Sequence, residues 1–192
     1  MVFVVLVMLL SGCAREIKTA ETEAPEVPMT EVPAEENGSA YIYYLHTDRE
    51  DRATLERLGE TFSRRSGIPV TIEYVDEKDY AIRLQQVMAG REMPTAFFLQ
   101  DADAAYAWDD YTSDLSQTYL GSKVRYPSEY FYYLGKAAGV PDRVSADRNF
   151  VALNAQADEA SMDATEKFFS WIFCSAEGRT SFPNRGYADC YR

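Results

Sequence analysis

The sequence predicts an α/β fold: a three-layer sandwich in which a mainly parallel sheet lies between two layers of helices. The first observation is a regular alternation of strand-like and helical segments between residues 41 and 99. Strand, helix, strand, helix, strand at this short spacing is typical of parallel strands joined by helical crossovers. The second is size, because the 152 residues from 41 to 192 are enough for one domain with a buried core.

The first half of this domain contains five expected elements. Tyr41–Leu45 is aromatic and apolar, as a buried strand would be, whereas residues 69–75 alternate apolar and polar side chains. Apolar residues at helical spacing follow each of these strands and stop at Gly67 and Gly90, which favour helix ends. Thr95–Leu99 is a third, fully apolar strand.

Two segments contain residues that typically cap the N-terminus of a helix. Thr47 and Glu50 fit a capping box, in which each side chain bonds a backbone N–H that the first helical turn leaves free. Asp101 can cap a short helix that follows the third strand.

The second half of the domain is less regular. Residues 114–127 are polar without a clear period, and residues 130–134 fit a strand or a helix. Residues 150–153 are expected to form a strand, and Ser175 can cap a last short helix. Between them, four apolar residues form a stripe on one helix face: Ala164, Phe168, Trp171 and Ile172.

The N-terminal residues 1–13 have the pattern of a lipoprotein signal peptide. An apolar run from Val2 to Leu10 is too short to span a bilayer and is closed by Leu-Ser-Gly-Cys, a lipobox. We expect cleavage before Cys13 and lipidation of that residue, which would hold the protein at the extracytoplasmic face of the cell membrane. The alternative is an ordinary secretory signal followed by a chance cysteine.

Residues 14–40 are expected to be a disordered acidic tether. They contain seven acidic and two basic residues, three prolines and almost no large apolar side chain. Such a segment cannot bury enough surface to offset its chain entropy. Residues 41–192 are therefore expected to form a single folded lobe beyond the tether.

Charge and residue counts exclude several function classes. The net charge of −12 argues against nucleic acid as a partner, because phosphate backbones repel an acidic surface. The chain has one histidine and no His/Cys spacing suited to a metal, and no Gly-rich phosphate loop precedes a helix. We expect no cofactor, no metal and no enzymatic activity, although counting acidic residues does not rule out a pair of glycosidase carboxylates.

Cys174 and Cys190 are the two thiols besides Cys13. In an exported domain they could form a disulfide that pins the C-terminal tail to the preceding helix. The equal alternative is that both stay reduced, with Cys174 buried.

Five segments carry a family resemblance by their order along the chain. They are FSRRSGIPVTIEYV at 62–75, YAIRLQQVMAG at 80–90, MPTAFFLQD at 93–101, WDDYTSDLSQ at 108–117 and the stretch from NFVALN to SAEGR at 149–179. Behind a lipobox and an acidic tether, this order resembles extracellular solute-binding lipoproteins of carbohydrate ABC importers, of the family 1 type. The fold that the resemblance implies is one lobe of a periplasmic binding protein.

The chain departs from that family between residues 116 and 150. Members have two α/β lobes hinged around a cleft, and most of the second lobe would normally lie in this interval. The resemblance therefore implies an internally shortened member that lacks most of its second lobe.

The carboxyl ends of parallel strands are where open α/β sheets bind ligands. Carboxylates and amides at this edge could pair with sugar hydroxyls, and flat rings could cover sugar C–H faces. The candidate ligand-binding residues are His46, Asp48, Gln100, Asp101, Asp103, Trp108 and Tyr111. Each has a structural alternative: helix capping for Asp48 and Asp101, packing for Trp108, and a backbone hydrogen bond for His46.

The resulting hypothesis is a membrane-anchored solute-binding protein that captures a carbohydrate and delivers it to ABC permease subunits. Closure around a ligand needs two lobes, so a single lobe would leave its ligand open to solvent. The alternative is a non-transporting surface lipoprotein, or a degenerate remnant, that acts as an interaction module or has no ligand.

Overall fold

A computed structural model of the chain describes residues 39–47, 52–100, 102–125, 130–142 and 149–181. The signal peptide and all but the last two residues of the tether fall outside these ranges. Cys13, Asp48, Asp101 and Cys190 also lie outside the described residues, so their predicted roles stay predictions.

Six strands form one mixed sheet in the spatial order β2-β1-β3-β6-β5-β4. The strands are β1 (Ile42–Thr47), β2 (Val70–Val75), β3 (Ala96–Leu99), β4 (Phe131–Tyr133), β5 (Lys136–Pro141) and β6 (Phe150–Leu153). β1 pairs in parallel with β2 and β3, because helical crossovers join these three strands. β6 then pairs antiparallel with both β3 and β5, and β4 with β5.

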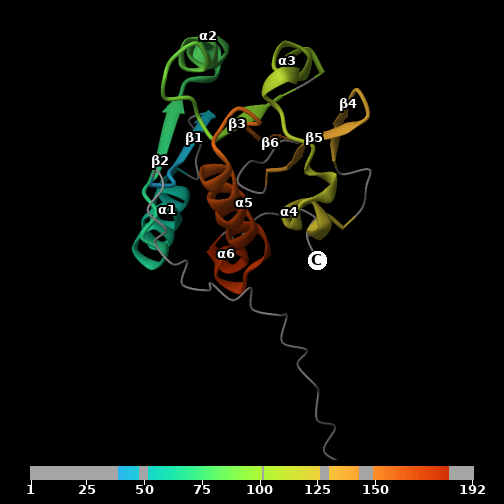
Figure 1. Cartoon of the computed structure of the whole chain (residues 1–192). Helices are drawn as coiled ribbons and strands as arrows, with labels where there is room; N and C mark the ends of the chain where they lie inside the picture. The colour runs from blue at the N-terminus through green and yellow to red at the C-terminus, as the bar shows by residue number, and fades with distance from the viewer. Residues whose placement is uncertain (1–38, 48–51, 101, 126–129, 143–148, 182–192) are drawn as a thin grey trace, which may run out of the picture.

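Helices cover both faces of this sheet (Figure 1). They are α1 (Arg52–Ser66), α2 (Glu77–Met88), α3 (Ala102–Ala107), α4 (Tyr119–Lys123), α5 (Glu159–Cys174) and α6 (Ala176–Ser181), with short 3-10 turns η1 (Asp109–Tyr111) and η2 (Leu115–Gln117). The predicted α/β sandwich is confirmed. Its parallel part is confined to β1, β2 and β3, whereas β4, β5 and β6 enter the sheet through antiparallel pairings.

The core has two layers, one on each face of the sheet. On the α1 and α5 face, Leu58 and Phe62 pack with Phe168, and the Tyr44 and Phe169 rings meet edge to face at 5.0 Å. On the α2 and α3 face, the core is made mainly by β1, β3 and α2. Its fully or almost fully buried side chains include Leu45, Tyr80, Leu84, Phe97 and Leu99.

Several local predictions are decided by the structure. The α5 stripe of Ala164, Phe168, Trp171 and Ile172 is buried as expected. Ser175 caps α6 by accepting a hydrogen bond from Gly178 N at 3.0 Å. Thr47 is the last residue of β1, and its proposed capping partner Glu50 lies outside the described residues.

The segment that fitted either a strand or a helix is strand β4. It joins β5 through a tight turn at Leu134 and Gly135, which both have positive φ, 47° and 85°. Two such residues match the twist of a two-residue hairpin. No helix in the part of the chain that the structure describes is long and apolar enough to cross a bilayer.

Candidate functional site

The sheet has two edges at which strands begin or end, and they differ in chemistry. β1, β2, β3 and β5 run in one direction, so their last residues lie at the same edge, which we call the carboxyl edge. The opposite edge, where these strands begin, is the amino edge. The ligand residues predicted from the sequence follow β1 and β3, and so belong at the carboxyl edge.

Exposed polar side chains occupy the carboxyl edge. Gln100 follows β3, and its Nε2 donates to Oε1 of Glu77, the first residue of α2, at 3.0 Å. Asp103 lies in the first turn of α3 and is exposed. An amide, its carboxylate partner and a second carboxylate thus face solvent at this edge, and all three can hydrogen-bond hydroxyl groups.

His46 lies beneath this surface and is fully buried. Its Nε2 is 3.1 Å from Oδ2 of Asp142, and its Nδ1 is 2.5 Å from the carbonyl oxygen of Thr47. Both side chains of the His46–Asp142 pair are shielded from solvent. The backbone contact expected as the structural alternative for His46 is present, and its role as a ligand contact stays a prediction.

Asp142 was not among the residues predicted from the sequence. It follows β5, and its backbone N–H bonds the carbonyl of Asn149 at 2.8 Å, which closes the chain between β5 and β6. The apolar residues 137–140 before it are typical of a buried strand. They did not indicate that the end of this strand would lie close to the end of β1. Its position could not be predicted because β5 enters the sheet by antiparallel pairing with β6, which is not visible in local sequence.

Trp108 and Tyr111, which follow α3, form an aromatic pair on the α2 and α3 face. Both are half-buried, pack against the α2 and α3 face of the core, and contact each other edge to face at 5.6 Å. The backbone carbonyl of Tyr111 accepts from Ala155 N at 2.8 Å, just after the end of β6. Because β6 is antiparallel to β3, its last residue lies beside the first residue of β3, at the amino edge. The chain through α3 and η1 therefore runs from the carboxyl edge, where β3 ends, to the amino edge.

The structure therefore brings together Gln100 and the additional residue Glu77, with Asp103 on the same edge, and places Tyr111 apart from them. Trp108 lies between, at the end of α3. The structural alternative of packing holds for the buried part of its ring.

Within the described ranges, one cysteine is present, and it forms no disulfide. Cys174 is buried at the end of α5, and its suggested partner Cys190 is outside the described ranges. Among residues with described positions, no cluster of three or more His, Cys, Asp or Glu side chains could hold a metal ion.

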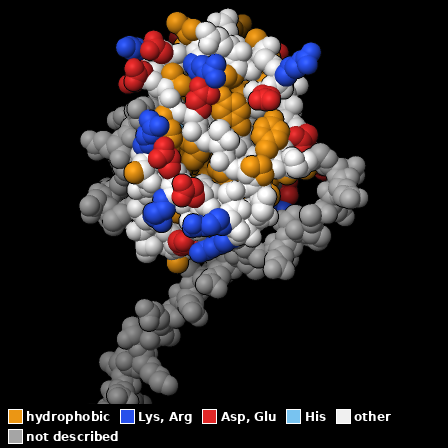
Figure 2. Space-filling model, turned by 90° about the vertical axis from the view of Figure 1, so that its left-hand side faces the viewer, with side chains coloured by type: hydrophobic (Ala, Val, Ile, Leu, Met, Phe, Trp, Pro, Cys, Tyr) orange, Lys and Arg blue, Asp and Glu red, His pale blue; other side chains and the backbone are white. Residues whose placement is uncertain are grey.

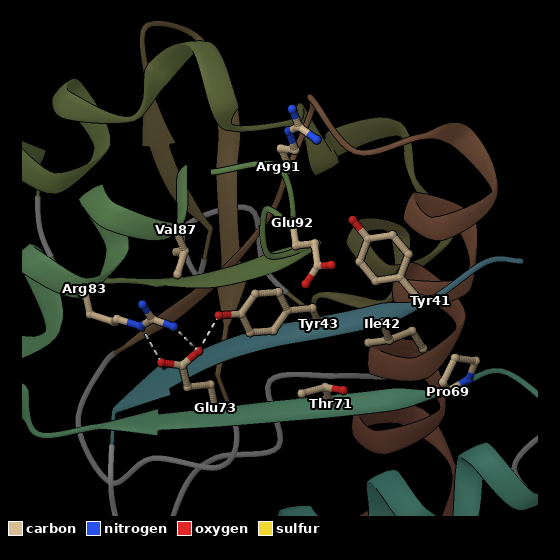
Figure 3. Close-up of a pocket in the computed structure, with 10 residues that line it drawn as sticks. All are labelled: Tyr41, Ile42, Tyr43, Pro69, Thr71, Glu73, Arg83, Val87, Arg91 and Glu92. Carbon is tan, nitrogen blue, oxygen red and sulfur yellow. Dashed lines mark hydrogen bonds and ion pairs between the residues drawn. The ribbon is translucent and has the colours of Figure 1, made fainter. Parts of the chain in front are cut away.

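A pocket of about 640 Å³ lies at the amino edge, beside the edge strand β2 (Figure 3). Residues from the starts of β1 and β2, from α2 and from the loop before β3 line it. They are Tyr41, Ile42, Tyr43, Pro69, Thr71, Glu73, Arg83, Val87, Arg91 and Glu92. Figure 2 views the molecule from the left-hand side of Figure 1, the side of β2, and shows hydrophobic side chains at its centre with charged groups around them.

One wall of the pocket is a hydrogen-bonded group of three side chains. Arg83 Nε and Nη2 donate to the two carboxylate oxygens of Glu73 at 2.5 and 3.1 Å, and the Tyr43 hydroxyl donates to Glu73 Oε2. The Arg83 bond is the main reason that the pKa of Glu73 lies below its usual value. Burial, followed by the bond to Glu73, raises the pKa of Tyr43. Glu73 is thus an ionised carboxylate whose charge is already balanced.

The sequence contained part of this pocket in its alternation. Tyr43 lies two residues before Leu45 in β1, and Glu73 in β2 is the cross-strand partner of Leu45. All three side chains therefore lie on the same face of the sheet. A pocket there was not predicted, because open α/β sheets usually bind ligands at the carboxyl ends of their strands. Arg91 and Glu92 also lie in a loop that carries no recognisable motif.

Comparison with known proteins gave matches among solved structures only. No protein-family model and no curated protein matches the sequence. Three of the structures that match are solute-binding or substrate-binding proteins. A family 1 extracellular solute-binding protein from Bifidobacterium longum subsp. infantis is 21% identical, with a TM-score of 0.46, over 55% of this chain and 28% of that one.

A family 1 extracellular solute-binding protein from Alicyclobacillus acidocaldarius is 18% identical, with a TM-score of 0.47, over 56% of this chain and 29% of that one. An ABC substrate-binding protein from Listeria monocytogenes, solved in complex with cycloalternan, is 24% identical, with a TM-score of 0.41, over 51% of this chain and 27% of that one. The matches thus span about half of this chain and less than a third of those proteins.

Proposed function

We propose that this chain is the solute-binding component of an ABC importer, held by a lipid on Cys13 at the extracytoplasmic face of the membrane, with a carbohydrate as its ligand. The observation that carries the proposal is the polar group at the carboxyl edge, where Gln100 and Glu77 bond each other at 3.0 Å and Asp103 is exposed in the first turn of α3. An open α/β sheet offers its ligand site at this edge.

The chemistry of these groups suits a neutral polyhydroxylated ligand. Carboxylate oxygens accept from hydroxyl groups, and the Gln100 amide can both donate and accept. Trp108 would supply the flat apolar surface that sugar C–H faces need. The buried His46–Asp142 pair would keep the ends of β1 and β5 in a fixed relation below the ligand.

The order of the sequence motifs supports transport as the purpose of binding. The lipobox and acidic tether would place the lobe near permease subunits of the importer, and these are the proposed partners. The shortened interval between residues 116 and 150 supports the second candidate, a surface lipoprotein that binds a partner without transport, because one lobe cannot enclose a ligand.

Isothermal titration calorimetry of the whole chain with neutral di- to hexasaccharides tests the proposal. We expect one sugar class to bind, and Gln100→Ala and Asp103→Ala each to weaken it about threefold to tenfold, the worth of one hydrogen bond of about 1 kcal/mol. Gln117→Ala and Asp163→Ala are matched controls, since both residues are exposed on other elements and should leave affinity unchanged.

Absence of binding by every sugar, with the fold intact by circular dichroism, would instead support the non-transporting lipoprotein. Equal effects of the control and test variants would show that the carboxyl edge is not the site.

A further inference from the structure

The amino-edge pocket has two tyrosine rings whose hydroxyls are tied to the protein. The Tyr43 hydroxyl donates to Glu73, and the Tyr41 hydroxyl donates to the carbonyl of Met93 at 3.3 Å. Because each hydroxyl is hydrogen-bonded, the orientation of both rings is restrained. Figure 3 shows the two rings on either side of the space in front of Glu92. The pocket walls are therefore aromatic and already positioned before a ligand arrives.

The charges that line the pocket are not equally free. Arg83 is used by Glu73 in a two-point bond, so neither charge is available to a ligand. Glu92 makes no hydrogen bond or ion pair with any residue whose position is described. In Figure 3 its carboxylate points in between Tyr41 and Tyr43, while the guanidinium of Arg91 points away from it, toward the outside.

The uncompensated charge inside the pocket is thus negative. The effect of this charge extends to Tyr41, whose pKa is raised first by burial and then by the nearby carboxylates of Asp158 and Glu92. An anion would meet the same repulsion. A neutral ligand would leave the carboxylate without a charged partner.

We propose that this pocket is a second ligand site, for an organic cation: an amine or quaternary ammonium group with a small apolar body. The cationic group would lie against the Glu92 carboxylate, and the faces of Tyr41 and Tyr43 would attract it through their negative π surfaces. A cavity of about 640 Å³ holds a ligand of this class with room for its body. The site is at the opposite edge of the sheet from Gln100, so it does not depend on the proposed function.

A pair of isosteric probes tests the charge requirement directly. Choline and 3,3-dimethylbutan-1-ol have the same shape, but only choline is charged. Titrated into the whole chain at low ionic strength and followed by NMR, choline should bind saturably and its neutral isostere should bind at least about tenfold more weakly. Acetate should not bind.

Variants locate the site. Glu92→Gln removes the charge at nearly constant shape and should weaken choline about tenfold, and Tyr41→Leu should weaken it by about fivefold through loss of one ring. Arg91→Gln removes a positive charge that lines the pocket and should leave choline binding equal or stronger, whereas Glu60→Gln on α1 is the control and should not change it. Glu92 and Arg91 are exposed, so these variants should fold.

Equal binding of choline and its isostere would overturn the proposal, as would tighter binding of acetate than of choline or no response to Glu92→Gln. Sugar binding measured in the same variants should be unaffected. Failure at the amino edge and failure at the carboxyl edge can therefore be told apart.

Discussion

At the scale of single residues, the carboxyl edge depends on a polar pair that is hidden from solvent. His46 and Asp142 come from β1 and from the residue after β5, strands separated in the sheet by β3 and β6. Their bond at 3.1 Å joins positions 96 residues apart in sequence. Buried polar groups of this kind are costly to leave without a partner.

Replacing Asp142 by Ala should lower the free energy of unfolding by about 2–3 kcal/mol, because His46 Nε2 loses the acceptor that it has in the fold. Asp142→Asn keeps an oxygen acceptor and should cost less. Urea unfolding measures both, with Asp103→Ala as the exposed control, expected to stay within about 0.5 kcal/mol of wild type. Wild-type stability in Asp142→Ala would contradict a structural role for the pair.

The burial of His46 could have been predicted from the sequence, although we listed the residue as a candidate ligand contact. It alternates with Ile42 and Tyr44, and both belong to the core of the α1 and α5 face. A period of two therefore predicts that His46 faces inward. Its partner could not be predicted, because the Asp142 contact depends on antiparallel pairing between distant segments.

At the scale of elements, α5 carries much of one core layer and begins at a defined cap. Asp158 Oδ1 accepts from the backbone N–H of Ser161 at 2.9 Å. This bond is the largest cause of a pKa of Asp158 below its usual value. The cap is thus strongest when the carboxyl group is ionised.

Asp158→Ala should reduce the free energy of unfolding by about 1 kcal/mol at neutral pH, the usual value of an N-cap. Because the pKa of Asp158 is lower in the folded than in the unfolded chain, its stabilisation is present above the unfolded pKa of about 3.9 and is lost as pH falls through the folded value. The difference between wild type and variant should therefore shrink in acid, as urea unfolding at pH 7 and pH 3 can show.

Asp163→Ala is the matched control within the same helix. It removes an exposed i,i+4 pair with Lys167 and should cost less than about 0.5 kcal/mol. An Asp158 variant no less stable than this control would contradict the cap.

The elements with clear periods were predicted, and the remainder depended on contacts between distant segments. β1 and β3 follow from short apolar runs, because both strands are almost wholly buried, and β2 follows from alternation. α1 and α2 follow from apolar stripes that end at a glycine, because each helix buries one stripe. The β4–β5 hairpin lacked a recognisable turn, since Leu134 adopts a positive φ that asparagine or glycine usually supplies. Antiparallel insertion of β6 between β3 and β5 had no local pattern at all.

At the scale of the whole molecule, the sheet presents a different chemistry at each edge. The carboxyl edge has a solvent-exposed amide and carboxylates, which we propose bind a neutral sugar. The amino edge has a carboxylate between two tyrosine rings, which we propose bind a cation. Neither edge uses the side chains of the other. One lobe could therefore bind two kinds of ligand without competition between them.

Tryptophan emission tests the carbohydrate proposal most directly, because the chain has only two tryptophans and they lie in different layers. Trp171 is buried under α1, and Trp108 is half-buried on the other face. A sugar that binds at the carboxyl edge and covers Trp108 should shift its emission saturably and protect it from acrylamide, and Trp108→Phe should abolish both effects. Unchanged emission at sugar concentrations that saturate binding by calorimetry would contradict the proposed site.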